Sequence, residues 1–151
     1  MKKVKAKILM VDDDAHICRV MSLILEGEGY EVETANTGEA AIEKSKTKTY
    51  DVAILDIRLP DIEGTRLLKV MRETSPKMVK IMLTGYPNLQ NAVDSLNSGA
   101  DAYLTKPPNP EDIIKSIEEK LQKRKEDEIA TEEKISVFLK VRAEKLLQES
   151  E

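Results

Sequence analysis

Five polar residues that follow short apolar runs could act together in one site: Asp12, Asp13, Asp56, Thr84 and Lys106. Three clustered carboxylates repel one another, and a hard divalent cation such as Mg²⁺ relieves that repulsion while leaving a position for a phosphate oxygen. A carboxylate can accept a phosphoryl group, whose charge an amine and a hydroxyl would stabilise. These residue types therefore predict phosphoryl transfer to an aspartate, and Asp56 is the candidate nucleophile.

The apolar runs before these residues are typical of strands in a parallel sheet. Residues 8–11, 52–55 and 79–83 are mostly apolar, residues 102–104 form a shorter run, and residues 30–35 alternate like a half-exposed edge strand. Because amphipathic segments alternate with these runs, the sequence predicts an α/β fold with helices on both faces of the sheet. Carboxyl ends of parallel strands share one edge, where open α/β sheets place their sites.

Taken singly, each of these polar residues has a simple structural explanation. Asp14 continues the acidic run but directly precedes a predicted helix, so we interpret it as the N-cap of that helix. A Lys-Pro or Thr-Gly pair by itself is typical of a turn. The indication of function comes from the ordered set, in which polar groups follow several successive strands.

Composition excludes several classes of protein. The 151 residues, 40% hydrophobic and 34% charged, fit one domain with a charged extension. The net charge of −4 and the lack of a basic run longer than residues 123–125 argue against direct nucleic-acid binding. No apolar stretch approaches the roughly 20 residues that span a bilayer, and no signal peptide is recognisable. The single cysteine, Cys18, cannot form an internal disulfide. We therefore expect a cytoplasmic protein without membrane contact.

Four motifs resemble the receiver domain of two-component response regulators. They are Val11-Asp12-Asp13, Leu55-Asp56 followed by Pro60 and Gly64, Leu83-Thr84-Gly85, and Tyr103-Leu104-Thr105-Lys106-Pro107. The resemblance covers roughly residues 6–123. It implies a flavodoxin-like, doubly wound parallel sheet of five strands in the order 2-1-3-4-5.

The resemblance also implies a metal-dependent phosphoacceptor. Asp56 would take a phosphoryl group from a sensor histidine kinase. Mg²⁺ would bind Asp13, Asp56 and the backbone carbonyl of Arg58 directly, and Asp12 would act largely through a bound water.

Further roles follow from the same resemblance. Thr84 and Lys106 would hold the phosphoryl oxygens, Tyr103 would be the switch aromatic, and the peptide bond after Lys106 would be cis. Arg58 and Tyr86 occupy positions that tune phosphate lifetime in the family. Phosphorylation would alter the surface of the fourth helix, fifth strand and fifth helix, and so control a downstream effector protein or a fused output domain, with a phosphorylation-dependent homodimer as a further outcome.

Residues 124–151 lie beyond the predicted receiver domain, residues 1–123, as a charged helical extension or linker. Their apolar residues recur at helical spacing: Ile135, Phe138, Leu139, Val141, Leu146 and Leu147. The heptad seam continued from Ile114 and Leu121 meets Glu128 and Arg142, which is too polar for one continuous coiled coil. Two alternatives stand: a long fifth helix, or a separate terminal helix. Either could pack on a surface or be solvated.

Other functions fit the sequence less well. A phosphatase with an aspartyl nucleophile needs a second aspartate two residues later, where this chain has Arg58, so we expect a signalling phosphoacceptor rather than an enzyme. A nucleotide-binding protein would need a Gly-rich loop after the first strand. The remaining alternative is a phosphorylation-independent protein-interaction module with the same fold, against which the intact acidic cluster argues.

Overall fold

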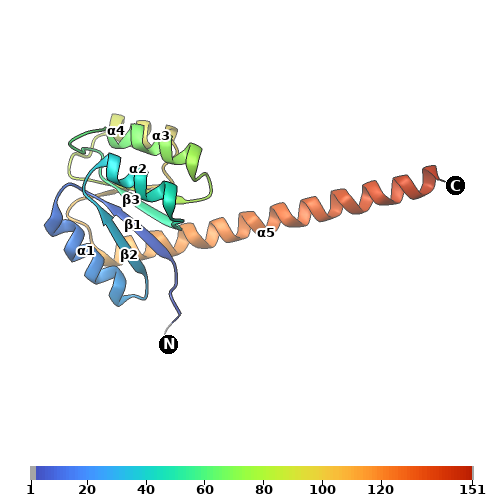
Figure 1. The fold of residues 1–151 in the computed structure, drawn as a ribbon, viewed down its shortest axis with the longest axis horizontal. Helices are drawn as coiled ribbons and strands as arrows, with labels where there is room; N and C mark the ends of the chain where they lie inside the picture. The colour runs from blue at the N-terminus through green and yellow to red at the C-terminus, as the bar shows by residue number, and fades with distance from the viewer. Residues whose placement is uncertain (1–2, 151) are drawn as a thin grey trace.

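A five-stranded parallel sheet in the order β2-β1-β3-β4-β5 forms the centre of the computed structural model, which describes residues 3–150 (Figure 1). The strands are β1 (Lys7–Val11), β2 (Glu31–Ala35), β3 (Val52–Leu55), β4 (Val79–Thr84) and β5 (Ala102–Thr105). Neighbouring strands pair in parallel throughout. The predicted flavodoxin-like α/β class and strand order are confirmed.

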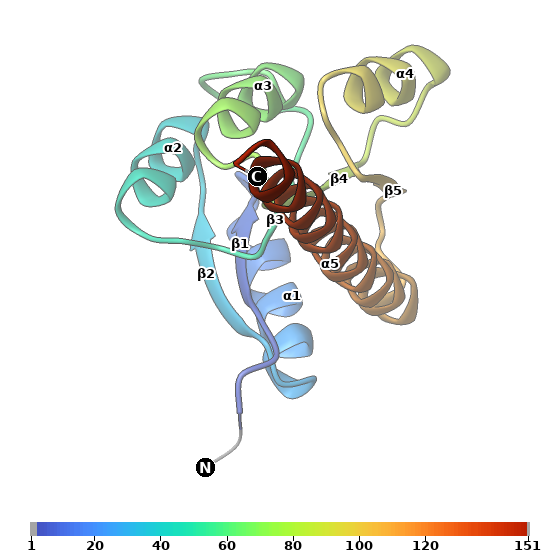
Figure 2. The same ribbon diagram turned by 90° about the vertical axis from the view of Figure 1, so that its right-hand side faces the viewer.

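Helices cover both faces of this sheet. They are α1 (Ala15–Gly27), α2 (Gly38–Thr47), α3 (Gly64–Thr74), α4 (Leu89–Asn97) and α5 (Pro110–Glu149). Figure 2 shows α1 and α5 on one side of the sheet and α2, α3 and α4 on the other. Along β1, Ile8 and Met10 pack into the core beneath α1 and α5, whereas Leu9 and Val11 pack beneath α2 and α3. The central strands β1, β3 and β4 are mostly apolar without alternation because both faces are buried, although β4 contains the buried Lys80.

Short polar side chains fix where α1, α2, α4 and α5 begin. Asp14 accepts hydrogen bonds from two backbone N–H groups in the first turn of α1, which confirms its interpretation as an N-cap. Thr37, Asn88 and Asn109 cap α2, α4 and α5 in the same way. Because these caps lie after the strands, each of these helices starts a few residues beyond a strand end. The residues in between are free to carry the polar groups of a site.

The last helix, α5, is continuous across the boundary predicted at residue 123. Its first part is anchored by Ile113 and Ile117, which are buried beneath the sheet. Arg124 makes the last anchoring contact, because its guanidinium donates to the backbone carbonyl and the carboxylate of Asp51, each over 3.1 Å. Residues 125–150 are all exposed, and at 1.5 Å per residue the helix runs about 37 Å beyond the body (Figure 1). Of the two alternatives for the extension, the structure has the long fifth helix.

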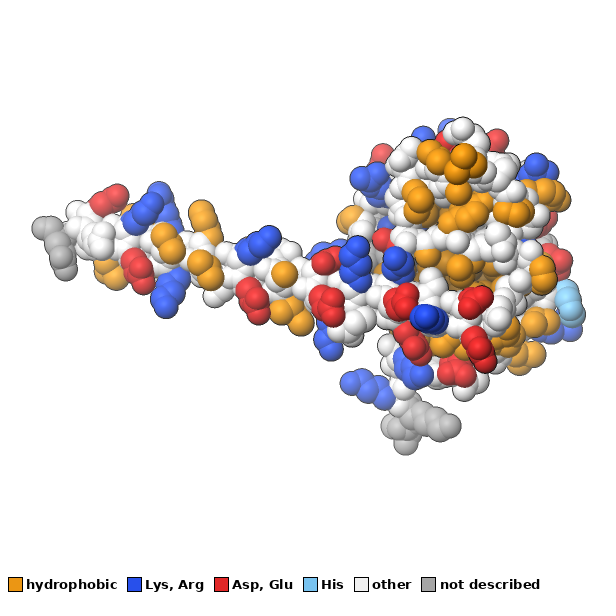
Figure 3. Space-filling model, turned by 180° about the vertical axis from the view of Figure 1, so that it is seen from behind, with side chains coloured by type: hydrophobic (Ala, Val, Ile, Leu, Met, Phe, Trp, Pro, Cys, Tyr) orange, Lys and Arg blue, Asp and Glu red, His pale blue; other side chains and the backbone are white. Residues whose placement is uncertain are grey.

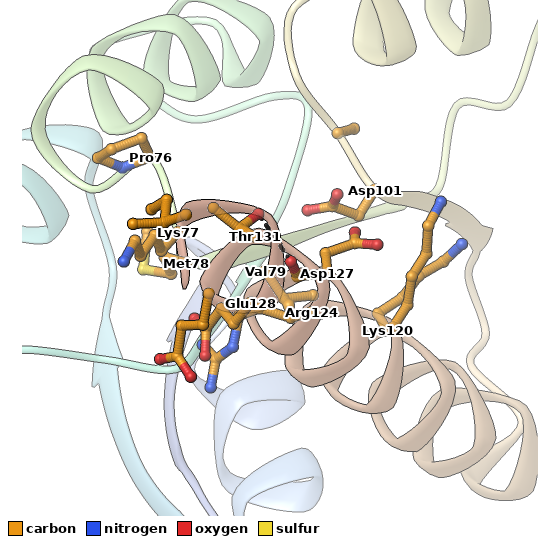
Figure 4. Close-up of a pocket in the computed structure, with 14 residues that line it drawn as sticks. Pro76, Lys77, Met78, Val79, Asp101, Lys120, Arg124, Asp127, Glu128 and Thr131 are labelled. Carbon is orange, nitrogen blue, oxygen red and sulfur yellow. Dashed lines mark hydrogen bonds between the residues drawn. The ribbon is translucent and has the colours of Figure 1, made fainter. Parts of the chain in front are cut away.

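Exposed apolar residues mark this extension, as Figure 3 shows from behind. They are Ile129, Ile135, Val137, Phe138, Leu139, Val141, Leu146 and Leu147. A groove lies between α5 and the amino-terminal edge of the sheet (Figure 4), lined in part by Met78, Lys120, Asp127 and Ile135. The predicted site residues do not line it. Within residues 3–150, no helix combines the length and apolar character needed to cross a bilayer.

The edge strand β2 gives the fold a pH-dependent contact. Glu33 receives hydrogen bonds from the Lys48 amine, at 2.6 Å, and from the Tyr50 hydroxyl. These contacts, that of Lys48 first, lower the pKa of Glu33 to about 2. An unfolded glutamate has a pKa of about 4.3, so this contact stabilises the fold fully above about pH 5 and its contribution is lost as the pH falls towards about 2.

We therefore expect the unfolding free energy of Glu33→Gln to fall less than that of the wild type as the pH is lowered. Urea unfolding between about pH 7 and about pH 3 measures this fall. Glu119→Gln is the matched control, because the exposed Glu119 lies 4.0 Å from Lys115 in a surface pair. An equal fall for the Glu33 variant and the wild type would contradict the assignment.

Candidate functional site

One ammonium group joins two carboxylates from different strands at the carboxyl edge of the sheet. Lys106, which follows β5, places Nζ 2.5 Å from Oδ2 of Asp12 and 3.2 Å from Oδ2 of Asp56. Asp12 follows β1 and Asp56 follows β3, and they are only 1% and 6% exposed. The sheet therefore brings together groups that are up to 94 residues apart in the sequence, as the strand ends predicted.

A third carboxylate completes an acidic cluster. Oxygens of Asp12, Asp13 and Asp56 lie within 4.8 Å of one another, with Asp13 exposed and the other two buried. Burial raises the pKa of Asp12 and outweighs the opposing hydrogen bond from Lys106. Burial alone would lower the pKa of Lys106, but its hydrogen bond to Asp12 and the two negative charges raise it. An all-oxygen donor set with one side open to water has the chemistry that Mg²⁺ prefers.

The loop after Asp56 is folded tightly back on itself. The backbone N–H of Gly64 donates to the carbonyl of Ile57 over 2.6 Å, and Arg58 pairs with Glu63 in an isolated antiparallel bridge. A Cβ atom on Gly64 would lie 2.3 Å from the carbonyl oxygen of Asp56 and 2.7 Å from Cα of Ile57. Glycine at position 64 therefore permits the close approach that fixes the backbone of Asp56 and Arg58.

Thr84 lies at the end of β4, and the side chains of Arg58 and Tyr86 stack on each other in the loops after β3 and β4. Thr84 is buried and accepts a hydrogen bond from the backbone N–H of Tyr86 over 3.0 Å. The guanidinium of Arg58 lies 3.8 Å from the centre of the Tyr86 ring. Cation–π stacking at this distance holds two exposed side chains against each other. The sequence singled out Arg58 and Tyr86 separately, but the contact between them is seen only in the structure.

Tyr103 on β5 points inward. It packs against the core cluster beneath α2 and α3, and its hydroxyl oxygen is buried without a hydrogen-bond partner among residues 3–150. A buried hydroxyl left unpaired costs about 1–3 kcal/mol, so packing of the ring must offset that cost. The peptide bond between Lys106 and Pro107 is cis, as expected.

Two residues near the site were not identified from the sequence. The amide of Asn36 donates to the backbone carbonyl of Asp12 over 3.0 Å, and the thiol of Cys18 donates to the same oxygen over 3.4 Å. Both contacts depend on how α1 and the segment after β2 pack around the end of β1. No local pattern in the sequence indicates them.

A scan against family models matches residues 8–118 to the response regulator receiver domain. Among curated relatives, the transcriptional regulatory protein ZraR of Klebsiella oxytoca is 39% identical over 100 residues, which cover 66% of this chain and 23% of ZraR. The cell cycle response regulator CtrA of Brucella ovis is 33% identical over 111 residues, which cover 74% of this chain and 48% of CtrA. The chain thus spans less than half the length of these relatives.

Solved structures agree with this match. A CheY-like response regulator receiver domain protein from Methanospirillum hungatei JF-1 is 47% identical, with a TM-score of 0.79. The superposed region covers 83% of this chain and 99% of that one. The family match, the relatives and the shared fold lead to one conclusion: this chain belongs to the response regulator receiver domain family.

Proposed function

We propose that this chain is a signalling switch that accepts a phosphoryl group on Asp56 from a sensor histidine kinase. The observation that carries this proposal is the Lys106 ammonium held between the buried carboxylates of Asp12 and Asp56. In the transfer, a carboxylate oxygen of Asp56 forms a bond to phosphorus while the bond from phosphorus to the kinase histidine breaks. Lys106 and the Thr84 hydroxyl stabilise charge on the phosphoryl oxygens. The chain is then a phosphoacceptor rather than an enzyme with a separate substrate.

Mg²⁺ is the proposed cofactor of this transfer. Asp13, Asp56 and the backbone carbonyl of Arg58 would hold the ion, with Asp12 acting through a water. The bound ion would supply positive charge that offsets the carboxylates and the phosphoryl oxygens. The compact, oxygen-only cluster with one exposed carboxylate supports this assignment.

The proposed output is a shift between two arrangements of α4 and β5. A phosphoryl group on Asp56 adds charge and acceptor oxygens that favour one position of Thr84, and with it one position of Tyr103. In α4 only Ser95 is buried, so few contacts hold this helix in one place. The altered surface of α4, β5 and α5 would then act on a downstream effector protein or a fused output domain, or form a phosphorylation-dependent homodimer.

Mg²⁺-dependent reaction with acetyl phosphate, followed by intact mass, tests the proposal. We expect the wild type to gain one phosphoryl group, Asp56→Asn to gain none, and the exposed control Asp94→Asn to behave as the wild type. Light scattering after size exclusion on the same samples tests homodimer formation. If the wild type gains no phosphoryl group, the alternative, a phosphorylation-independent interaction module, is favoured instead.

The stacked pair of Arg58 and Tyr86 is expected to slow hydrolysis of the phosphoryl group by limiting the approach of water. We expect Arg58→Ala to lose the group roughly tenfold faster than the wild type, a change of about 1.4 kcal/mol in the barrier. Because each side chain holds the other, Tyr86→Ala and the double variant are expected to match this rate rather than add to it.

Intact mass followed over time after removal of acetyl phosphate measures the loss. Arg66→Ala, which removes an exposed arginine from α3, serves as the control. A double variant that keeps its phosphoryl group as long as the wild type would refute this role.

A further inference from the structure

The carboxylate of Asp61, which is not part of the acidic cluster, connects the phosphoacceptor loop, residues 56–63 between β3 and α3, to the start of α2. Asp61 lies between β3 and α3, in the same loop as Asp56 and Arg58. Its Oδ1 accepts a hydrogen bond from the backbone N–H of Gly38 over 2.9 Å, and its Oδ2 accepts one from Glu39 over 2.8 Å. The two donors open α2, 22 and 23 residues earlier in the chain. One side chain therefore joins two segments that no strand pairing connects.

The contact has a favourable electrostatic setting. The first turn of α2 presents N–H groups without partners inside the helix, and the helix dipole favours a negative charge there. Thr37 accepts a hydrogen bond from only one of these groups, that of Ala40, and Asp61 accepts from two more. These hydrogen bonds lower the pKa of Asp61, so the carboxylate is charged at neutral pH.

Apolar packing holds the same two segments together. A Cβ atom on Gly38 would lie 1.9 Å from Cγ2 of Ile62, so the loop residue next to Asp61 occupies the space that a larger side chain would fill. Ile62 also packs against the core cluster beneath α2 and α3. The loop is thus fixed at its outer end to α2 and at its base by the contact between Gly64 and Ile57.

We propose that Asp61 is a positioning residue, which fastens the phosphoacceptor loop to the N-terminus of α2 and thereby holds the Arg58 backbone and the Asp56 carboxylate in place. This inference rests on the proposed function for its consequence in Mg²⁺ binding and phosphorylation. Residues that orient metal ligands typically change metal affinity 10–100-fold when they are removed. Asp61 touches neither the ion nor the phosphoryl group and acts only through the loop.

Thr37→Ala provides a matched control, because the Thr37 side chain caps the same helix through the N–H of Ala40 and not through a hydrogen bond to the loop. We expect Asp61→Ala and Thr37→Ala to lose similar unfolding free energy in urea. Only Asp61→Ala is expected to bind Mg²⁺ about tenfold more weakly by titration calorimetry, to accept a phosphoryl group from acetyl phosphate more slowly, and to exchange the amide hydrogens of residues 57–59 faster. Asp61→Asn keeps one acceptor oxygen and should restore part of each effect.

Equal Mg²⁺ affinity and equal loop exchange in Asp61→Ala and Thr37→Ala would overturn the proposal, leaving Asp61 as a helix cap only. Failure of the proposed function is a separate outcome. A wild type that takes no phosphoryl group would refute phosphoacceptance, yet the amide exchange of residues 57–59 can be measured without phosphate or Mg²⁺. That exchange therefore decides the positioning role by itself.

Discussion

The free energy of unfolding of the Gly64→Ala variant is expected to be about 3 kcal/mol lower than that of the wild type, which corresponds to a Tm about 10 °C lower. The added methyl carbon would lie 2.3 Å from the Asp56 carbonyl oxygen and 2.7 Å from Cα of Ile57. Both are backbone atoms that cannot turn away. Alanine is a better helix former than glycine by about 1 kcal/mol, but the steric cost is larger, so the substitution is destabilising.

The same substitution is expected to slow phosphorylation, because relief of the clash must move the backbone of Asp56. Urea unfolding and the rate of reaction with acetyl phosphate measure the two effects. Gly27→Ala is the control: Gly27 ends α1, and apart from its chain neighbours and the backbone of its own helix, no atom of residues 3–150 would lie within 4 Å of the added carbon. It should be neutral or stabilising by up to about 1 kcal/mol. Equal stability of the two variants would contradict the steric account.

Removal of the Lys106 charge is expected to have the second large effect. Without Mg²⁺, Lys106→Met would leave the carboxylates of Asp12 and Asp56 buried without their cation. Breaking a buried pair in this way costs about 3–5 kcal/mol, so we expect the unfolding free energy at neutral pH to fall by about 3 kcal/mol. The loss should be smaller in acid, since burial raises the pKa of Asp12 and protonation removes its charge.

Two further measurements separate the structural and chemical roles of Lys106. Mg²⁺ should stabilise Lys106→Met more than it stabilises the wild type, because the ion offsets the same carboxylates. Reaction with acetyl phosphate at saturating Mg²⁺ should still be about 10²–10³-fold slower, as when one charge-stabilising donor is removed. Lys115→Met, at an exposed lysine 4.0 Å from Glu119, should change neither the stabilisation by Mg²⁺ nor the rate of phosphorylation. Phosphorylation of Lys106→Met at the wild-type rate would exclude the proposed role.

The sequence by itself determined the strands of the sheet, the start of α1 and the set of residues at the carboxyl edge of the sheet. Apolar runs such as residues 52–55 mark strands buried on both faces, since an unpaired polar side chain there is costly. Asp14 marks the N-terminus of α1, because a short side-chain oxygen satisfies free N–H groups locally. Residues that follow parallel strands must meet at one edge, so Asp12, Asp56 and Lys106 could be grouped before any distance was known.

Only the tertiary structure decided the contacts between segments distant in sequence. The stacking of Arg58 on Tyr86, the hydrogen bond from Asn36 to Asp12, and the tether from Asp61 to α2 each depend on how loops pack. The path of α5 was likewise open, because charged residues after Arg124 fit both a break and a solvated helix. Local pattern fixes which face of an element is buried, whereas the partner of an exposed side chain depends on packing that the pattern does not encode.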